Sequence, residues 1–115
     1  MATNRDLIIV AVQRLQEQVP ALAKLRLVLG LELTGGGLTG PATSQRYRIE
    51  VPGPQVSEGP ADDARIELSM PQTMFSLLAE EGQFDDWKEA FYYGHLEVQG
   101  DPRVRRLLGR AIERN

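Results

Sequence analysis

The 115-residue sequence contains no cysteine and a single histidine, His95. The absence of thiols excludes a disulfide framework and a thiolate metal site. A lone imidazole without oxygen-rich partners does not make a metal centre. In addition, no serine stands in the sequence context of a nucleophile elbow. We therefore expect no metal, no cofactor and no enzymatic activity.

Long apolar runs and a signal-peptide pattern are also absent, which favours a soluble, cytoplasmic protein. The formal net charge of −3 is too small to indicate a polyanionic partner. Aromatic residues are not interleaved with the arginines, so we do not expect nucleic-acid binding. A composition of 42% hydrophobic and 25% charged residues is ordinary for one globular domain spanning residues 1–115. The predominance of arginine over lysine is typical of a GC-rich, bacterial genome.

One glycine-rich segment, residues 35–40, formally matches the G-x-G-x-x-G fingerprint of dinucleotide-binding proteins. In that fingerprint the last glycine opens a helix whose amides face the pyrophosphate. Here Pro41 follows, and the chain leads directly into another alternating segment. A Walker-type G-K-[ST] sequence is missing too. The segment therefore predicts a loop between two strands rather than a nucleotide site.

Alternation of apolar residues is the clearest pattern that is present. Five leucines at every second position predict a strand over Leu25–Leu33, and Tyr47, Ile49 and Val51 predict another. Two such strands joined by a loop indicate an antiparallel pair. We expect their odd-numbered residues to lie on the face that helices cover.

The remaining elements follow from helical and strand periodicity. A first helix, capped by Thr3 or Asn4, ends near Pro20. Residues 55–57 suggest a short edge strand and residues 65–70 a further strand. Pro71 starts a short helix, Gly82 can end it, and Gln83 or Asp85 can cap the next. The apolar positions assigned to the helices are Leu7, Val10, Ala11, Leu15 and Val19, then Met74, Phe75, Leu77 and Leu78, then Trp87, Ala90 and Phe91.

The C-terminal part combines a short strand with an amphipathic helix. Leu96 and Val98 alternate with polar residues, and Asp101-Pro102 is a typical helix start. Apolar residues then recur at helical spacing among five arginines. The whole pattern predicts an α+β fold, with a mostly antiparallel sheet of about five strands and helices on one face.

Charge is distributed unevenly along the chain. Residues 58–89 contain nine acidic and two basic residues, whereas residues 101–115 contain two acidic and five basic ones. A basic amphipathic helix is typical of contact with an anionic membrane. It equally fits a solvated face that docks on an acidic surface of the same domain. Both alternatives remain open at this stage.

Six of the seven aromatic residues fall within residues 75–93, beside two methionines. Aromatic and methionine side chains adapt to irregular apolar shapes, which suits a lipid pocket. They suit an ordinary hydrophobic core just as well.

A family resemblance favours the pocket. The run Gly94-His95-Leu96-Glu97-Val98-Gln99-Gly100-Asp101, with an apolar helix behind it, resembles the sterol carrier protein 2 family. Members of this family typically show Gly-Lys-Leu-Lys-Val-x-Gly-Asp at this place. The run follows a helix that ends in Phe, and Phe91 occupies that position here. Residues 64–70 look like the strand that leads into the family's short helix. The chain departs from the family at His95, at Pro102 and in the long loop at 34–44.

The resemblance implies a hydrophobic tunnel between sheet and helices that holds a fatty acid, fatty acyl-CoA, sterol or isoprenoid without chemistry. Lipid binding or transfer is the function that it implies. The alternative is an accessory protein that presents lipid or apolar surface to a lipid-modifying enzyme. The residues expected to line the tunnel are Ile66, Leu68, Met74, Phe75, Leu78, Phe84, Trp87, Phe91, Leu96, Val98, Leu107, Leu108 and Ile112.

Overall fold

The computed structural model describes residues 3–35 and 45–113, with backbone only at positions 108 and 111–113. Of the predicted glycine loop, residues 36–44 lie outside the described residues. In chain order the elements are α1 (Asn4–Gln18), the 3-10 helix η1 (Pro20–Lys24), β1 (Leu27–Thr34), β2 (Gln45–Val51), β3 (Gln55–Glu58), β4 (Ile66–Pro71), α2 (Gln72–Glu81), α3 (Phe84–Tyr92), β5 (Glu97–Gly100) and α4 (Pro102–Glu113).

The five strands form one sheet in the order β3-β2-β1-β4-β5. The predicted antiparallel pair is confirmed, with Leu29 opposite Ile49 and Leu31 opposite Tyr47. The sheet is mostly antiparallel, as predicted, since three of its four strand pairings are antiparallel. It is not purely so, because β4 pairs parallel to β1 and the sheet is therefore mixed. After the antiparallel strands β1, β2 and β3, the chain crosses back over the sheet and adds β4 on the free side of β1.

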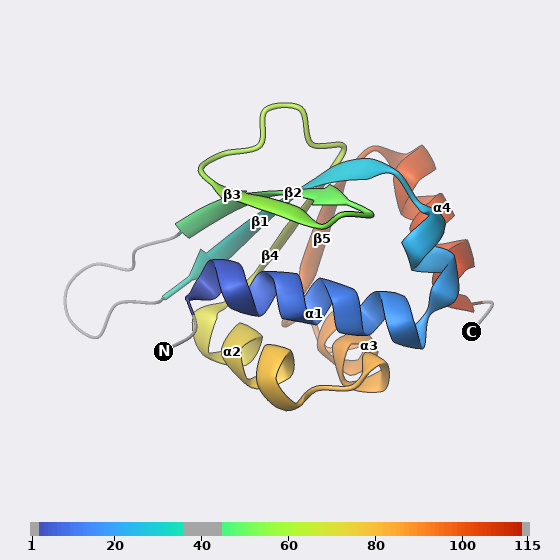
Figure 1. The fold of residues 1–115 in the computed structure, drawn as a ribbon. Coiled ribbons are helices and arrows are strands. Elements are labelled where there is room, and N and C mark those ends of the chain that lie inside the picture. Colours follow the sequence, from blue (N-terminus) through green and yellow to red (C-terminus); the bar gives the residue numbers. More distant parts are fainter. Residues whose placement is uncertain (1–2, 36–44, 114–115) are drawn as a thin grey trace.

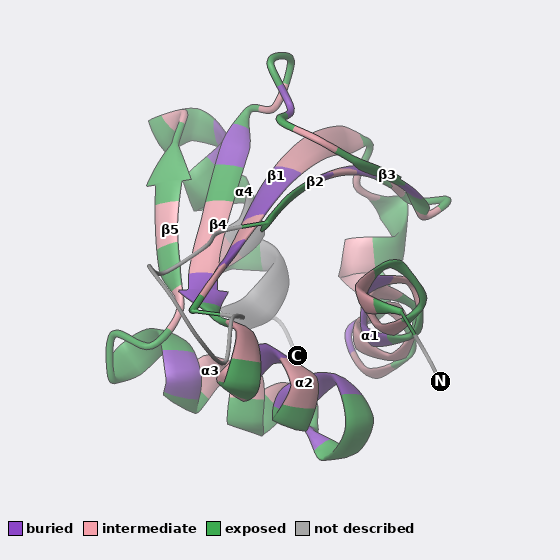
Figure 2. Cartoon of the chain, turned by 90° about the vertical axis from the view of Figure 1, so that its left-hand side faces the viewer, coloured by how far each residue is buried: buried purple, intermediate pink, exposed green. Residues whose placement is uncertain are grey.

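The helices lie on one side of the sheet, where the buried residues gather (Figures 1 and 2). Alternation along β1 and β2 places Leu31, Leu33, Tyr47 and Ile49 in this core, as predicted. Residues from α1, α2 and α3 complete it, and they are Ile8, Ala11, Phe75, Leu78, Ala79 and Ala90. The opposite, outer face of the sheet carries the charged residues of the same strands.

The buried stripe of α1 was predicted partly wrongly. Val10 is 44% exposed, whereas Ile8 is buried together with Ala11. Residues 7–12 are all apolar, so the local periodicity does not select the face that packs on the sheet. The packing of α1 against β3 and α2 settles its rotation.

The predicted helix starts are confirmed at three positions. Thr3 forms a capping box with Asp6, and Gln83 forms one with Asp86. At the start of α4, an Asp101 carboxylate oxygen accepts a hydrogen bond of 2.8 Å from the Arg103 amide. None of the described helices is both long enough and apolar enough to cross a membrane.

Candidate functional site

A groove runs between α2 and α3 on the helical side of the molecule. Met74, Leu77, Leu78 and Glu81 line it from α2, at the spacing i, i+3, i+4, i+7. The same spacing recurs along α3 and its C-cap residue in Asp86, Glu89, Ala90 and Tyr93. Gly82 and His95 complete the lining. Each helix thus presents one continuous stripe to the groove, which we call the α2–α3 groove.

The floor of the α2–α3 groove is apolar and its rim is acidic. Leu78 and Ala90 are buried at the bottom, and Met74 is half-buried beside them. Glu81, Asp86 and Glu89 are exposed at the edges. The volume of about 430 Å³ falls within the range of roughly 300–1,000 Å³ that small-molecule sites occupy.

The α2–α3 groove adjoins a layer of half-buried apolar side chains. Met74, Trp87, Leu68 and Leu96 all pack against the central core. The rings of Phe75 and Trp87 meet edge to face, with centroids 6.3 Å apart. Met74 belongs both to the groove lining and to this layer, so apolar side chains continue inwards from the groove floor.

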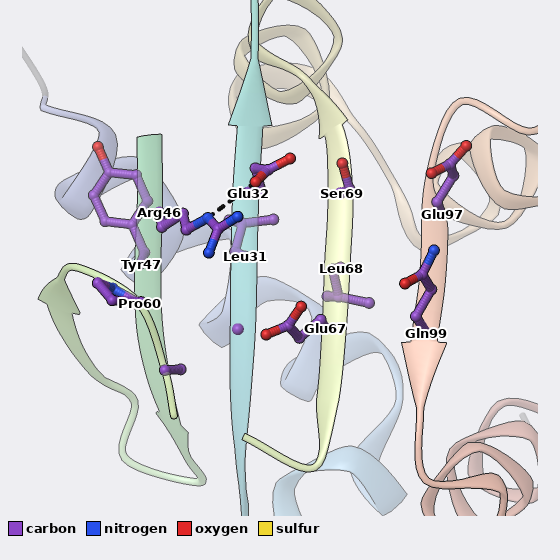
Figure 3. Close-up of a pocket in the computed structure, with 12 residues that line it drawn as sticks. Leu31, Glu32, Arg46, Tyr47, Pro60, Glu67, Leu68, Ser69, Glu97 and Gln99 are labelled. Carbon is purple, nitrogen blue, oxygen red and sulfur yellow. Dashed lines mark hydrogen bonds and ion pairs between the residues drawn. The ribbon is translucent and has the colours of Figure 1, made fainter. Parts of the chain in front are cut away.

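A second, smaller hollow of about 260 Å³ lies on the outer face of the sheet. Figure 3 shows Glu32, Ser69 and Glu97 side by side on β1, β4 and β5, with Arg46 directed at Glu32. The Arg46–Glu32 ion pair measures 3.0 Å. Because charged and polar side chains dominate its lining, this hollow does not suit an apolar ligand.

Electrostatic contacts outside the α2–α3 groove hold the crossing connection between β3 and β4. Arg48 on β2 donates two hydrogen bonds, of 3.0 and 2.7 Å, to the carboxylate of Asp63. The bond from Arg48 holds the pKa of Asp63 below its usual value, and the pKa of Arg48 is raised by the same contact. Among the described residues, no cluster of three or more His, Asp or Glu side chains could hold a metal ion.

Solved structures with the same arrangement of elements are numerous. The sterol carrier protein-2 of Aedes aegypti in complex with the C16 fatty acid palmitate is 21% identical. The match covers 97% of this chain and 96% of that one, with a TM-score of 0.58. The sterol carrier protein 2 fold is the fold of this chain. The predicted resemblance is thus confirmed.

Two further structures support this assignment. Palmitated SCP2L2 from Aedes aegypti is 14% identical, with 91% of this chain and 93% of that chain covered and a TM-score of 0.59. Apo sterol carrier protein 2 from Yarrowia lipolytica is 22% identical, with 82% and 85% covered and a TM-score of 0.54. No protein-family model matches the sequence, and no curated protein matches it.

Within this sterol carrier protein 2 fold, the predicted lining residues occupy different environments. Ile66, Phe75 and Leu78 are buried. Six more are half-buried, namely Leu68, Met74, Phe84, Trp87, Leu96 and Val98. Met74 and Leu78 line the α2–α3 groove. Their role as ligand contacts stays a prediction.

Three predicted inward-facing side chains point elsewhere. Phe91 is 46% exposed, Leu107 48% and Leu77 57%. Successive helical residues are rotated by about 100°, and α3 packs through its Ala90 side, which turns Phe91 outwards. In α2 the core contacts come from Phe75, Leu78 and Ala79, so Leu77 faces away and lines the groove instead.

The predicted tunnel wall from the C-terminal helix falls outside the described side chains. Leu108 and Ile112 belong to the backbone of α4, but their side chains are among those not described. The enclosed tunnel of the sterol carrier protein 2 fold therefore stays a prediction for this chain.

The sequence prediction missed several residues of the α2–α3 groove. Leu77 was expected to face the core, and Glu81, Asp86 and Glu89 were not assigned to a ligand site. The i, i+3, i+4, i+7 stripe from Met74 to Glu81 was a usable signal in α2. That α3 would align an equivalent stripe beside it is a tertiary property, which the local pattern of neither helix contains.

Proposed function

We propose that this chain is a lipid-binding domain, spanning residues 1–115, that carries an apolar tail without chemical change. The α2–α3 groove carries the proposal, because it joins an apolar floor to the half-buried layer against the sheet. The fold supports it, since two structures of that fold are described with palmitate. The ligand class is a single-tailed or sterol-like amphiphile.

The energetics of burial are sufficient for such a ligand. A tail of about 14 methylenes gains on the order of 10 kcal/mol at roughly 0.8 kcal/mol for each buried methylene. Association and tail ordering consume part of this gain. With an association cost at the low end, about 4 kcal/mol, the remainder of about 6 kcal/mol corresponds to a Kd of tens of micromolar, which suits a carrier that must also release its cargo.

The proposed tail site extends from the α2–α3 groove inwards. Met74, Leu77 and Leu78 contact the outer part of the tail, and Trp87 and Leu96 the inner part. Transfer between membranes is the proposed use of this binding.

Native mass spectrometry of the purified protein, with extraction of any bound lipid, tests the binding. The protein is then delipidated and titrated with palmitate and hexadecanol. The variant Leu77→Gln places an amide on the groove wall and is expected to weaken binding of both ligands by roughly three- to tenfold. Val10→Gln is the matched control, because Val10 is a similarly exposed helical residue that does not line the groove.

Two results would contradict the proposal. One is a protein that purifies without lipid and binds neither ligand. The other is equal weakening by Leu77→Gln and Val10→Gln, which would place the ligand outside the α2–α3 groove.

An accessory role beside a lipid-modifying enzyme is the second candidate, and exposed aromatic residues favour it. Phe91, Tyr92 and Tyr93 follow one another at the end of α3, and the two tyrosines are 80% and 76% exposed. Exposed aromatic residues are enriched at protein interfaces. Replacing Tyr92 by Ser would reduce the activity of such an enzyme partner while leaving lipid binding unchanged.

Contact with anionic membranes through α4 is part of the same proposal. Arg103, Arg106 and Arg110 are exposed on this helix, together with the half-exposed Leu107. Among the described residues these arginines form no ion pair. Their exposure would let them meet an anionic surface, which supports the membrane alternative.

A further inference from the structure

The ionic character of the α2–α3 groove bears on which amphiphile it accepts. Three carboxylates, those of Glu81, Asp86 and Glu89, stand on its rim. None of the described residues that line it is a lysine or an arginine. The other ionisable side chains of this described lining are Tyr93 and His95.

Two cationic side chains lie on or against these helices, and among the described residues neither forms an ion pair with the three carboxylates. Lys88 belongs to α3, but its ammonium lies 5.5 Å from the centroid of the Phe84 ring, and Lys88 does not line the groove. Arg14 of α1 donates to the carbonyl oxygens of Ala79 and Glu80, at 3.2 and 3.4 Å. A ligand head that lies at the rim therefore meets acidic side chains directly.

The three carboxylates project from defined positions on the two helices. Asp86 is part of the α3 capping box and accepts a hydrogen bond of 2.8 Å from the Gln83 amide. Glu81 is the last residue of α2, and Glu89 lies one helical turn after Asp86 on α3. An apolar tail on the groove floor would thus bring its polar head close to negatively charged side chains from both helices.

We propose that the α2–α3 groove selects amphiphiles with a cationic, amine-type head over those with a carboxylate head. This inference rests on the proposed lipid binding and deepens it. Like charges at a separation of a few ångströms repel and opposite charges attract, while water and salt reduce both effects. Three exposed carboxylates are expected to favour the amine over the carboxylate by roughly tenfold at low ionic strength.

Three ligands with the same 16-carbon tail as palmitate test the selection: hexadecylamine, hexadecanol and palmitate. Each displaces the neutral dye Nile red from the delipidated full chain, below the concentration at which the ligand aggregates. The expected order of affinity is amine, then alcohol, then carboxylate. The ratio of amine to carboxylate affinity is expected to shrink as salt is added.

The double variant Glu81→Gln/Glu89→Gln removes two rim charges at exposed helical positions. We expect it to reduce the tenfold ratio to about twofold, since one of three comparable charges remains. Glu67→Gln/Glu97→Gln is the matched control, because it removes the same charge from the outer face of the sheet (Figure 3). The control is expected to keep the original ratio, which separates a local effect from the overall negative charge.

The outcomes distinguish this inference from the function on which it rests. Palmitate binding as tightly as hexadecylamine would overturn the head-group selection and leave lipid binding in place. An equal change in both double variants would also overturn it, since the groove carboxylates would have no particular role. Failure of all three ligands to displace the dye would instead refute lipid binding itself.

Discussion

At the scale of single residues, the contact between Arg48 and Asp63 links side-chain chemistry to topology. The Arg48 guanidinium donates to both oxygens of the Asp63 carboxylate. This bidentate arrangement makes a strong interaction for an exposed pair. Asp63 belongs to the connection that crosses over the outer face of the sheet, where Ala61 is buried. Gly30 lies beneath it, and a Cβ on Gly30 would stand 3.6 Å from the Ala61 side chain. The Arg48–Asp63 contact thus stabilises the connection at residues 59–65, which leads into β4 beside β1.

This contact predicts a pH response with a definite sign. The hydrogen bond from Arg48 lowers the pKa of Asp63 in the folded state. A depressed folded-state pKa stabilises the fold above the unfolded-state value, and this stabilisation is lost as the pH falls through the folded-state value. NMR titration of the Asp63 carboxyl carbon should therefore show a midpoint below the ordinary value of about 3.9.

The variant Arg48→Gln should return the pKa of Asp63 towards that ordinary value. Arg46→Gln is the control, because Arg46 pairs with Glu32 instead. An Asp63 midpoint that is the same in Arg48→Gln as in the parent would contradict the assignment of the shift to this hydrogen bond.

At the scale of elements, strands were predicted better than the rotation of helices. A strand has only two faces, so the alternation in β1 and β2 fixed which residues are buried. A helix can rotate continuously, and several apolar residues can compete for its packed side. For this reason the predicted burial of Val10 in α1 and of Phe91 in α3 was wrong. The α2–α3 groove was missed because the alignment of the two helices is a tertiary property that neither local pattern contains.

The corner between β5 and α4 requires a glycine at position 100. Its φ of +137° is unfavourable for a residue with a side chain. A Cβ there would also collide with the carbonyl oxygen of Arg65 and stand 2.9 Å from the Cα of Ile66. The next amide, that of Asp101, donates to the same Arg65 carbonyl at 3.0 Å. A side chain at position 100 would therefore push the corner apart.

We predict that Gly100→Ala destabilises the domain by about 1–3 kcal/mol. Urea unfolding, followed by the fluorescence of Trp87, measures the change. Gly109→Ala is the opposite control, since a methyl group on this helical glycine would meet nothing within 4 Å. That substitution should stabilise α4 by up to about 1 kcal/mol. Equal stability of the two variants would refute the predicted strain.

At the scale of the whole molecule, the parallel pairing of β1 and β4 was beyond local sequence patterns. Alternation identifies a strand and its buried face, but not its neighbour across a long connection. The order β3-β2-β1-β4-β5 instead depends on the crossing of residues 59–65 over the sheet. The family resemblance implied the fold class, and it did so through a short run of residues around β5. The mixed character of the sheet emerged only from the assembled strands.

The molecule is also polarised in charge, which leads to a prediction about membranes. The acidic α2–α3 groove is lined from α2 and α3, and these two helices lie in a different part of the domain from the basic α4 (Figure 1). An anionic bilayer attracts exposed arginines by roughly 1 kcal/mol each, while it repels the groove carboxylates. The domain is therefore expected to approach such a bilayer with α4, inserting the half-exposed Leu107 between lipid heads.

Cosedimentation with vesicles measures this preference. At low salt the protein should bind phosphatidylglycerol vesicles and not phosphatidylcholine vesicles, and added salt should release it. The double variant Arg106→Gln/Arg110→Gln should lose about 30-fold in vesicle affinity, because two contacts of about 1 kcal/mol each are removed. Arg46→Gln, on the outer face of the sheet, removes one exposed charge elsewhere and should leave the affinity nearly unchanged. Binding that is insensitive to salt and to the α4 arginines would place the membrane-facing surface on another element.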